Sequence, residues 1–391
     1  MKNTPRHILP IIVIAQFFCT SLWFAGNAIM PELAIKLSLG LTDTGYITSA
    51  VQFGFIMGTL VYAILTIADR FNPANVFLIS AFFGAGFNSL MVLDVSFYQI
   101  LTFRFFTGFF LAGIYPVGMK IAADYYEKGL GKALSFLVGA LVLGTALPHL
   151  ISSYDTSFDW KVVIVSTSCL AIGGGLLIKL FVSEGPYRKK GQKPKFGQMK
   201  QAFQNRPFRA AAFGYFGHMW ELYAFWAFVP LVIQNNGHPR LYSGEVISLQ
   251  SFLIIAVGAL ACFIGGYISE KLGTQKTART FLFLSGLCCL LSPFAFEIDR
   301  PYFLAFMVFW GMVVIADSPL FSSLVAIRAT PELKGTAMTI VNCIGFAITI
   351  VSIQLVSYFA ITFDERIILL PLALGPALGL LALRKSTVGS S

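Results

Sequence analysis

Long apolar stretches alternate with short polar segments along the whole chain. Each stretch holds about 20 residues or more, the length that an α-helix needs to cross a hydrocarbon core of about 30 Å. Helices are expected and not a barrel, because a barrel would show shorter segments of alternating polarity. The twelve predicted spans are residues 8–30, 44–67, 74–93, 97–122, 130–151, 160–182, 208–234, 246–269, 277–296, 301–325, 336–358 and 365–384.

The first six spans and the last six repeat each other. Pro31 recurs as Pro230 and Pro116 recurs as Pro319, both at an offset of roughly 200 residues. An offset that changes so little indicates an internal duplication. Carriers built from two related halves commonly bind their substrate between the halves near the membrane midplane, with access alternating between the two sides. The pattern predicts an all-α integral membrane protein of two pseudo-symmetric six-helix bundles that transports a solute.

A polar segment separates the two sets of spans. It is rich in Gly, Pro and Lys, a composition that cannot build a core, so we expect a flexible linker there. The predicted domains are an N-terminal bundle of residues 1–182, a cytoplasmic linker of residues 183–206 and a C-terminal bundle of residues 207–391.

Composition and charge support a membrane location. Hydrophobic residues make up 57% of the chain and charged residues 12%, whereas soluble domains carry about 25% charged residues. Lys and Arg concentrate on one side if the N-terminus is inside, which predicts a multi-pass protein of the inner (plasma) membrane with both termini in the cytoplasm. The net charge of +10 would then attract anionic lipid headgroups and gives no reason to expect a nucleic acid partner.

The cysteines do not indicate a metal site. All six lie within apolar spans, without a spacing that links them to histidines, and we expect them to be packing residues. The chain also lacks a nucleotide-binding loop, a nucleophile motif and an extramembrane domain large enough for chemistry. We therefore expect neither a metal nor another cofactor, and no enzyme activity.

Three short segments resemble motifs of the major facilitator superfamily. Residues 65–73 read LTIADRFNP and residues 266–273 read GYISEKLG, and both resemble the family's G-x-L-x-D-R-x-G-R loop. In the first copy, Leu65, Asn72 and Pro73 stand where the motif has Gly, Gly and a basic residue. Residues 104–108, RFFTG, resemble the R-x-x-x-G motif. With the repeat, the resemblance covers the whole chain and implies the fold of that superfamily.

The resemblance also implies a gate at the inner face. Asp69 would face the start of span eleven, where the positive end of a helix favours a carboxylate, and Arg70 would pair with Asp124. Glu270-Lys271 is the corresponding pair in the second half. These contacts would hold the inner face shut. The alternative is that the loop charges are solvated and only set the topology.

Charges inside the spans are functional candidates, because each costs about 2.5–3.5 kcal/mol at a helix centre. Glu221 lies near the middle of span seven, and His218 lies three residues earlier on the same helical face. An acid in an apolar helix beside a residue that titrates near neutrality suits proton coupling or substrate binding. The alternative is a structural acid that pairs with a neighbouring helix.

Two further charges lie in spans four and ten. Arg104 could complement Glu221 across the bundle, hold an anionic substrate or form a buried structural ion pair. The resemblance links an arginine at this place to proton coupling. Asp317 stands beside Pro319 and could line the transport path or pack against a helix break. Lys120 should snorkel to the inner face.

Uncharged side chains extend the candidate site. Gln52 and Gln250 stand at corresponding places in spans two and eight, where nitrate carriers of the family have arginines, so nitrate is disfavoured and one solute could be hydrogen-bonded from both sides. Asn342 is a weaker candidate, because such amides also serve helix packing. The aromatic residues Trp23, Tyr223 and Trp226 could sandwich a planar or apolar solute, or simply pack.

The favoured function is a secondary active transporter of a small polar or anionic solute, coupled to protons. The alternatives are an efflux pump for hydrophobic or cationic compounds and a uniporter. Span five lacks the Gly-Pro pattern of the family's antiporters, so the direction of transport stays open. The expected partners are the small-molecule substrate, the coupling proton and membrane lipids, and the expected assembly is a monomer.

Overall fold

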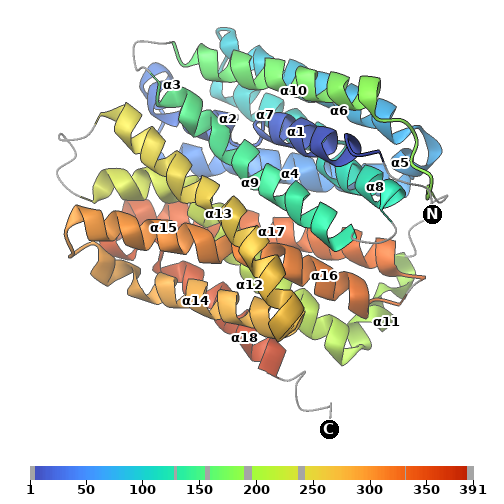
Figure 1. The fold of residues 1–391 in the computed structure, drawn as a ribbon. Helices are drawn as coiled ribbons and strands as arrows, with labels where there is room; N and C mark the ends of the chain where they lie inside the picture. Colours follow the sequence, from blue (N-terminus) through green and yellow to red (C-terminus); the bar gives the residue numbers. More distant parts are fainter. Residues whose placement is uncertain are drawn as a thin grey trace. The chain divides into compact units, whose positions relative to one another are not determined.

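The computed structural model describes residues 5–126, 130–154, 159–188, 196–236, 243–330 and 332–384. Within these ranges the secondary structure is helical, with no β-strand. Eleven helical stretches in the described part of the chain are long and apolar enough to cross a membrane, and the shorter apolar helix α1 precedes them. The prediction of an all-α membrane protein is therefore confirmed (Figure 1).

The chain divides into two compact units, and each is described by itself. The first unit contains Met1–Lys193 together with Gly244–Phe252, and the second contains Pro194–Ser243 and Leu253–Ser391. The division after residue 193 falls within the segment expected to be the linker, of which residues 189–195 lie outside the described ranges.

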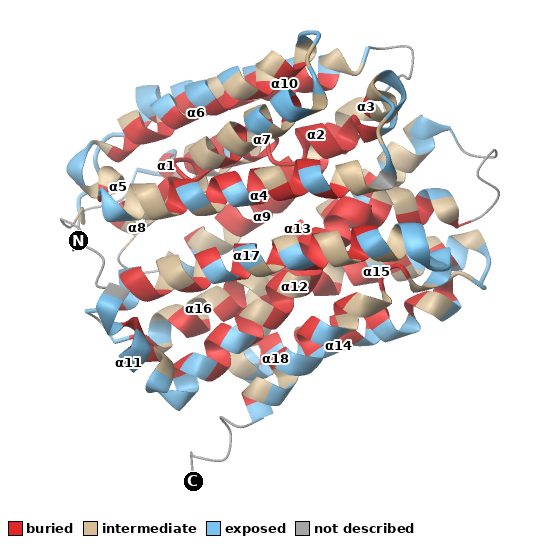
Figure 2. Cartoon of the chain, turned by 180° about the vertical axis from the view of Figure 1, so that it is seen from behind, coloured by how far each residue is buried: buried red, intermediate tan, exposed pale blue. Residues whose placement is uncertain are grey.

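The helices of the N-terminal half are α1 Ile8–Thr20, α2 Ala25–Ala28, α3 Met30–Leu37, α4 Leu41–Ile64, α5 Ile67–Arg70, α6 Pro73–Ser89, η1 Leu90–Val92, α7 Phe97–Leu111, α8 Tyr115–Tyr125, α9 Leu130–Ser152 and α10 Lys161–Phe181. Those of the C-terminal half are η2 Phe196–Gln198, α11 Met199–Gln204, α12 Arg206–Asn235, α13 Gly244–Leu272, α14 Thr274–Ala295, α15 Arg300–Ala316, α16 Ser318–Arg328, α17 Lys334–Thr362, η3 Glu365–Ile367, η4 Leu370–Ala373 and α18 Leu374–Arg384. Buried positions follow the faces that these helices turn toward one another (Figure 2).

The first predicted span is not one continuous helix. It is broken after Thr20 and again at Ile29, so that α1, α2 and α3 follow one another. Ser21 donates a hydrogen bond of 2.6 Å to the carbonyl of Phe18, which competes with the helix ladder. Pro31, in the first turn of α3, has no N–H to continue the preceding helix. The breaks leave backbone carbonyls available to side chains of other helices.

A break recurs at the related proline in each half. Spans four and ten are each two helices, α7 with α8 and α15 with α16, and Pro116 and Pro319 lie in the first turn of the second piece. Proline is tolerated there because those N–H groups have no helical acceptor. In the second unit the break leaves Asp317 between the two helices.

Two related glycines permit close helix approaches, one in each half. A Cβ atom on Gly108 would lie 2.0 Å from the carbonyl oxygen of Val51, and one on Gly311 would lie 2.0 Å from that of Ile254. Only glycine permits this contact, which brings α7 against α4 and α15 against α13. The internal repeat is therefore visible in the packing of each half as well as in the sequence.

Candidate functional site

Glu221 is held by two neighbouring helices of the second unit. Its side chain is 1% exposed on α12. Ser285, on α14, donates a hydrogen bond of 2.9 Å to Oε2, and the indole N–H of Trp310, on α15, donates one of 2.6 Å to Oε1. Both carboxylate oxygens are therefore engaged, and the acid is fixed between α12, α14 and α15.

His218 has a different partner, although it lies on the same helix. Its Nδ1 atom lies 2.7 Å from Oδ1 of Asp317, and both side chains are 1% exposed. The helix break at Pro319 places Asp317 there, facing α12. His218 Nε2 and Asp317 Oδ2 have no hydrogen-bond partner among the described residues. His218 and Asp317, called the His218–Asp317 dyad below, thus have open bonding capacity that Glu221 lacks.

The sequence-based pairing of His218 with Glu221 needs correction. The two side chains have different partners: His218 contacts Asp317 at the end of α15, and Glu221 accepts hydrogen bonds from Ser285 and Trp310. Residues three apart on a helix lie on only roughly the same face. The direction of each of these side chains is set by its polar partner on the neighbouring elements. Glu221, His218 and Asp317 therefore take part in two separate contacts. Glu221 contacts Trp310 on α15, and His218 contacts Asp317 at the end of α15.

Arg104 is fully buried in the first unit, at the break between α1 and α2. Its Nη1 donates hydrogen bonds of 2.9 Å to the Leu22 carbonyl and 3.0 Å to Asn88 Oδ1, and its Nη2 donates to the Trp23 carbonyl. No ion pair of Arg104 with an acid of its own unit occurs among the described residues, so the alternative of a buried structural ion pair is not observed within this unit. Carbonyl dipoles exposed by the helix break stabilise the charge instead.

The role of Arg104 follows from this geometry. Both ends of its planar fork are already engaged, and Asn88 is itself anchored by donating 3.0 Å to Ser168 Oγ. An anionic substrate that bound both Nη atoms would have to displace these contacts, whereas Nε has no hydrogen-bond partner among the described residues. The contact of Arg104 with Glu221 would join the two units and stays a prediction.

Gln52 is the candidate with the most open bonding capacity in the first unit. It is fully buried on α4, and neither of its amide atoms has a hydrogen-bond partner in the described part of the chain. One turn before it, Thr48 accepts a hydrogen bond of 2.7 Å from Asn27, and one turn after it, the ring of Phe55 packs 4.8 Å from Trp23. Gln52 therefore faces the broken first span, where a polar ligand or water could satisfy it.

The sequence interpretation missed Gln16. It is fully buried on α1, and both of its amide atoms also lack partners within the described ranges. Thr145 and His149, one turn apart on α9, each have one such open polar atom. A glutamine within the otherwise apolar run of residues 8–19 was the available signal. Gln250, on α13, is only partly buried, and its joint action with Gln52 stays a prediction.

The aromatic candidates pack within their own units. The ring of Tyr223 lies 5.4 Å from Trp226 and 5.2 Å from Phe346. Asn342, on α17, accepts a hydrogen bond of 2.9 Å from Tyr215, a residue that the sequence interpretation did not name. These contacts are consistent with packing, and a role in holding a planar solute stays a prediction.

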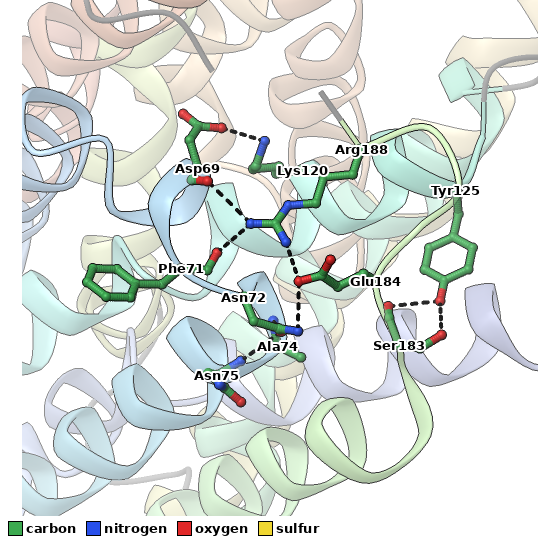
Figure 3. Close-up of polar contacts among 10 residues, drawn as sticks. All are labelled: Asp69, Phe71, Asn72, Ala74, Asn75, Lys120, Tyr125, Ser183, Glu184 and Arg188. Carbon is green, nitrogen blue, oxygen red and sulfur yellow. Dashed lines mark hydrogen bonds and ion pairs between the residues drawn. The ribbon is translucent and has the colours of Figure 1, made fainter. Parts of the chain in front are cut away.

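The gating candidate Asp69 lies among polar contacts with Lys120 and Arg188 in the first unit (Figure 3). Asp69 Oδ1 lies 2.7 Å from Nζ of Lys120, on α8. The predicted pair of Arg70 with Asp124 is absent from the described ion pairs. The carbonyls of Asp69 and Phe71 accept from Arg188 at 3.2 and 2.9 Å. The arginine bound at this loop is therefore Arg188, from the segment after α10, whereas the sequence predicted a contact of Arg70.

The corresponding loop of the second unit is different. Glu270 and Lys271 are exposed, and the Lys271 ammonium lies 4.7 Å from the ring centroid of Tyr267. No ion pair of either residue occurs among the contacts of the described chain. The contact expected between Asp69 and the start of span eleven would join the units and remains a prediction.

Comparison with known proteins identifies the family. The model of the major facilitator superfamily matches residues 12–353, and the chain belongs to this superfamily of membrane transporters. It is therefore embedded in a membrane and is a transporter and not an enzyme.

The relatives with curated names are distant. A probable L-galactonate transporter of Escherichia coli is 22% identical over 66% of this chain, and the match spans 62% of that relative's length. An uncharacterized MFS-type transporter, YceJ, of Bacillus subtilis is 23% identical over 86% of this chain and 84% of its own. A bicyclomycin resistance protein homolog of Haemophilus influenzae is 21% identical over 81% and 80%.

Solved structures share the fold. A bacterial homolog of the human lysosomal transporter Spinster, in an inward-facing and occupied conformation, has a TM-score of 0.73 at 15% identity and covers 100% of this chain and 98% of its own. The partially occluded inward-open xylose transporter XylE of E. coli has a TM-score of 0.75 at 14% identity, with 98% of both chains covered. At these identities the likeness concerns the fold alone.

Proposed function

We propose that the protein is a proton-coupled secondary active transporter that moves a small polar or anionic solute by alternating access. The observation that carries the proposal is the His218–Asp317 dyad, an imidazole and a carboxylate 2.7 Å apart and 1% exposed within a membrane protein. Such groups are costly inside a membrane, and proton pathways are their best-known use.

The dyad can hold one proton in more than one way. A proton can sit on the imidazole, which leaves a charged pair, or on the carboxylate, which leaves a neutral one. Nε2 of His218 and Oδ2 of Asp317 have no partner among the described residues, so a proton or a solute hydroxyl could reach them. Glu221 has both oxygens occupied by Ser285 and Trp310, and we assign it the second place in the proton pathway.

The solute class is inferred from the open amides of the first unit. Gln16 and Gln52 each present an unpartnered donor and acceptor in the described structure, and an unpaired buried polar group costs about 1–3 kcal/mol. A hydroxylated or carboxylated solute would supply the missing partners. The name of the L-galactonate relative, which refers to a sugar acid, agrees with that class.

A second candidate function is export of hydrophobic or cationic compounds. The aromatic cluster of Tyr223, Trp226 and Phe346 favours it, as does the bicyclomycin resistance relative. A uniporter is the third form. Our proposal also includes an inner-membrane location, cytoplasmic termini, contact with membrane lipids and a monomeric state, inferred from the distribution of Lys and Arg and from the fold.

The test uses purified protein in proteoliposomes with an internal pH dye. Sugar acids, neutral sugars and lipophilic cations are added one at a time to wild type, Asp317→Asn and the control Glu297→Gln, whose carboxylate is exposed. A pH change triggered by a sugar acid and lost only in Asp317→Asn supports the proposal. A response to lipophilic cations alone would favour export, and isotope flux without a pH change would mean uniport.

A further inference from the structure

The first seven residues after α10 are docked on the helix bundle, although the sequence predicted a flexible linker from residue 183 onward. This segment, Val182–Arg188, is called the strap below. The amide of Tyr187 donates 3.0 Å to the carbonyl of Asp124, and the hydroxyl of Tyr125 donates 2.9 Å to the carbonyl of Ser183. A Cβ atom on Gly185 would lie 2.3 Å from the Asp124 carbonyl oxygen. The strap therefore lies directly against the end of α8.

The other edge of the strap holds the loop between α4 and α6, residues 66–72. Arg188 donates to the carbonyls of Asp69 and Phe71, at 3.2 and 2.9 Å, and to the Glu184 carboxylate. Glu184 in turn accepts a hydrogen bond of 3.1 Å from Asn72. Figure 3 shows the Arg188 guanidinium between the loop carbonyls and Glu184. The loop and the strap thus share one cation.

The loop that Arg188 holds contains a strained residue. Thr66 has φ 50° and ψ 41°, a left-handed conformation that is uncommon for a β-branched side chain. Its carbonyl accepts from the amides of Asp69 and Arg70 at 3.0 and 2.9 Å, so the short helix α5 is built on this conformation. Strained backbone persists only where surrounding contacts hold it.

The charges around Arg188 make its removal consequential. Asp69, Asp124 and Glu184 face Lys120 and Arg188, and Asp124 interacts electrostatically with both cations. Asp124 thus feels two cations and two other carboxylates. Without Arg188, Asp124 would keep only Lys120 of these two cations, and its repulsion from Asp69 and Glu184 would favour separation of the strap from the loop.

We propose that the strap is a conformational latch in which Arg188 couples the linker between the two halves to the 66–72 loop and holds Thr66 in its strained conformation. A displacement of the linker that draws Arg188 away would release Thr66 and reorient α5 with Asp69. The latch needs neither the solute nor the proton assigned above, so it can fail or hold independently of the proposed function.

The test is hydrogen exchange of the full-length protein in nanodiscs, read by mass spectrometry of peptides that cover residues 64–75 and 180–188. Arg188→Gln should raise exchange in both peptides together, by about tenfold, because one donor links them. Lys200→Gln, which removes an exposed cation on α11, is the matched control and should change neither. If Arg188→Gln loosens the strap peptide while the loop peptide keeps wild-type exchange, the coupling is refuted.

Two further variants separate the latch from general loss of structure. Gly185→Ala adds a Cβ against the Asp124 backbone and should loosen both peptides with all charges retained. Thr66→Asn accepts the left-handed conformation more readily and should restore slow loop exchange in the Arg188→Gln background. Continued fast loop exchange in that double variant would show that strain at Thr66 does not drive the release, and would overturn this part of the proposal.

Discussion

The two halves bury opposite charges in related places, and they satisfy them in different ways. In the first unit, Arg104 on α7 donates to two backbone carbonyls and one amide at the break of the first span. In the second unit, the related helix α15 and its end contribute Trp310 and Asp317, which contact Glu221 and His218 on α12. Two backbone carbonyls and one side-chain amide accept from the cation, whereas the described polar partners of Glu221 and His218 are side chains.

This difference suggests a structural role for Arg104 and a proton-carrying role for the buried acids and histidine of the second unit. A guanidinium remains protonated in proteins, so Arg104 cannot carry the coupling proton itself. Carboxylates and an imidazole can exchange protons, and two atoms of the His218–Asp317 dyad have no partner in the described structure. In the first half, α7 stabilises the broken first span through Arg104. In the second half, the related helix α15 ends at Asp317, which in our proposal takes up the proton.

The largest effect is expected from removing the buried cation. Arg104→Leu leaves the carbonyls of Leu22 and Trp23 and Oδ1 of Asn88 without their donor, and each buried acceptor left unpaired should cost about 1–3 kcal/mol. Arg104→Lys should be only partly tolerated, because an ammonium cannot reproduce the planar fork. Thermal unfolding in detergent measures both, with Arg209→Lys at an exposed position as the control. Wild-type stability of Arg104→Leu would contradict the architectural role.

The second effect is on transport. Asp317→Asn should lower proton-driven uptake about 100-fold, in the range typical of a lost acid–base group, while the melting temperature changes little. Initial rates with an imposed pH gradient measure it, and Glu297→Gln should transport like wild type. If uptake by Asp317→Asn still depends on the pH gradient, the coupling proton binds at another residue.

A smaller effect tests how Glu221 is held. Trp310→Phe keeps the ring and removes the N–H that lies 2.6 Å from Oε1, and should cost about 1.5–3 kcal/mol if the acceptor is charged. The matched change Trp220→Phe removes an N–H bonded at 3.1 Å to the Pro371 carbonyl and should cost about 0.5–1.5 kcal/mol. Equal losses, measured by chemical denaturation, would argue that Glu221 is neutral at the working pH.

The smallest effect is expected at Asp364, whose charged contact is exposed and not buried. Hydrogen bonds from Arg366 lower the pKa of Asp364 from 3.8 to about 2. Because the folded-state pKa is the lower one, the stabilisation is present above pH 3.8 and is lost as the pH falls toward 2. The difference in melting temperature between wild type and Asp364→Asn should therefore shrink over that window, and should be small in high salt. A difference that grows on acidification would contradict this sign.

The sequence predicted the fold well because the fold depends on patterns that are local in the chain. Apolar length located the spans, and the related prolines Pro116 and Pro319 coincide with related helix breaks. The first span was predicted as one helix, because the break near Ser21 lies inside a stretch that stays apolar on both sides. Thr66 gave no signal either, because any residue type can be forced into an uncommon conformation by its surroundings.

The candidate site was predicted only as a set of residues. Costly charges identified Glu221, His218, Asp317 and Arg104, but a periodic pattern does not say which helices face each other. His218 and Asp317 are 99 residues apart in the chain, and the partners of Arg104 include backbone carbonyls, which no side-chain pattern can show. The sequence predicts a flexible linker around Arg188, because its acceptors in the folded protein include backbone atoms of a distant loop, which leave no side-chain pattern.

The most direct test of the central claim is the protonation of the buried acids themselves. Infrared difference spectroscopy of the protein in lipid, over a range of pH, follows the carboxylic C=O stretch of a protonated acid in wild type, Asp317→Asn and Glu221→Gln. The account predicts a titrating band that disappears in Asp317→Asn and shifts in frequency in His218→Gln, with a second band assigned to Glu221. A single titrating band that persists in Asp317→Asn and is lost in Glu221→Gln would contradict the assignment of the proton to the dyad.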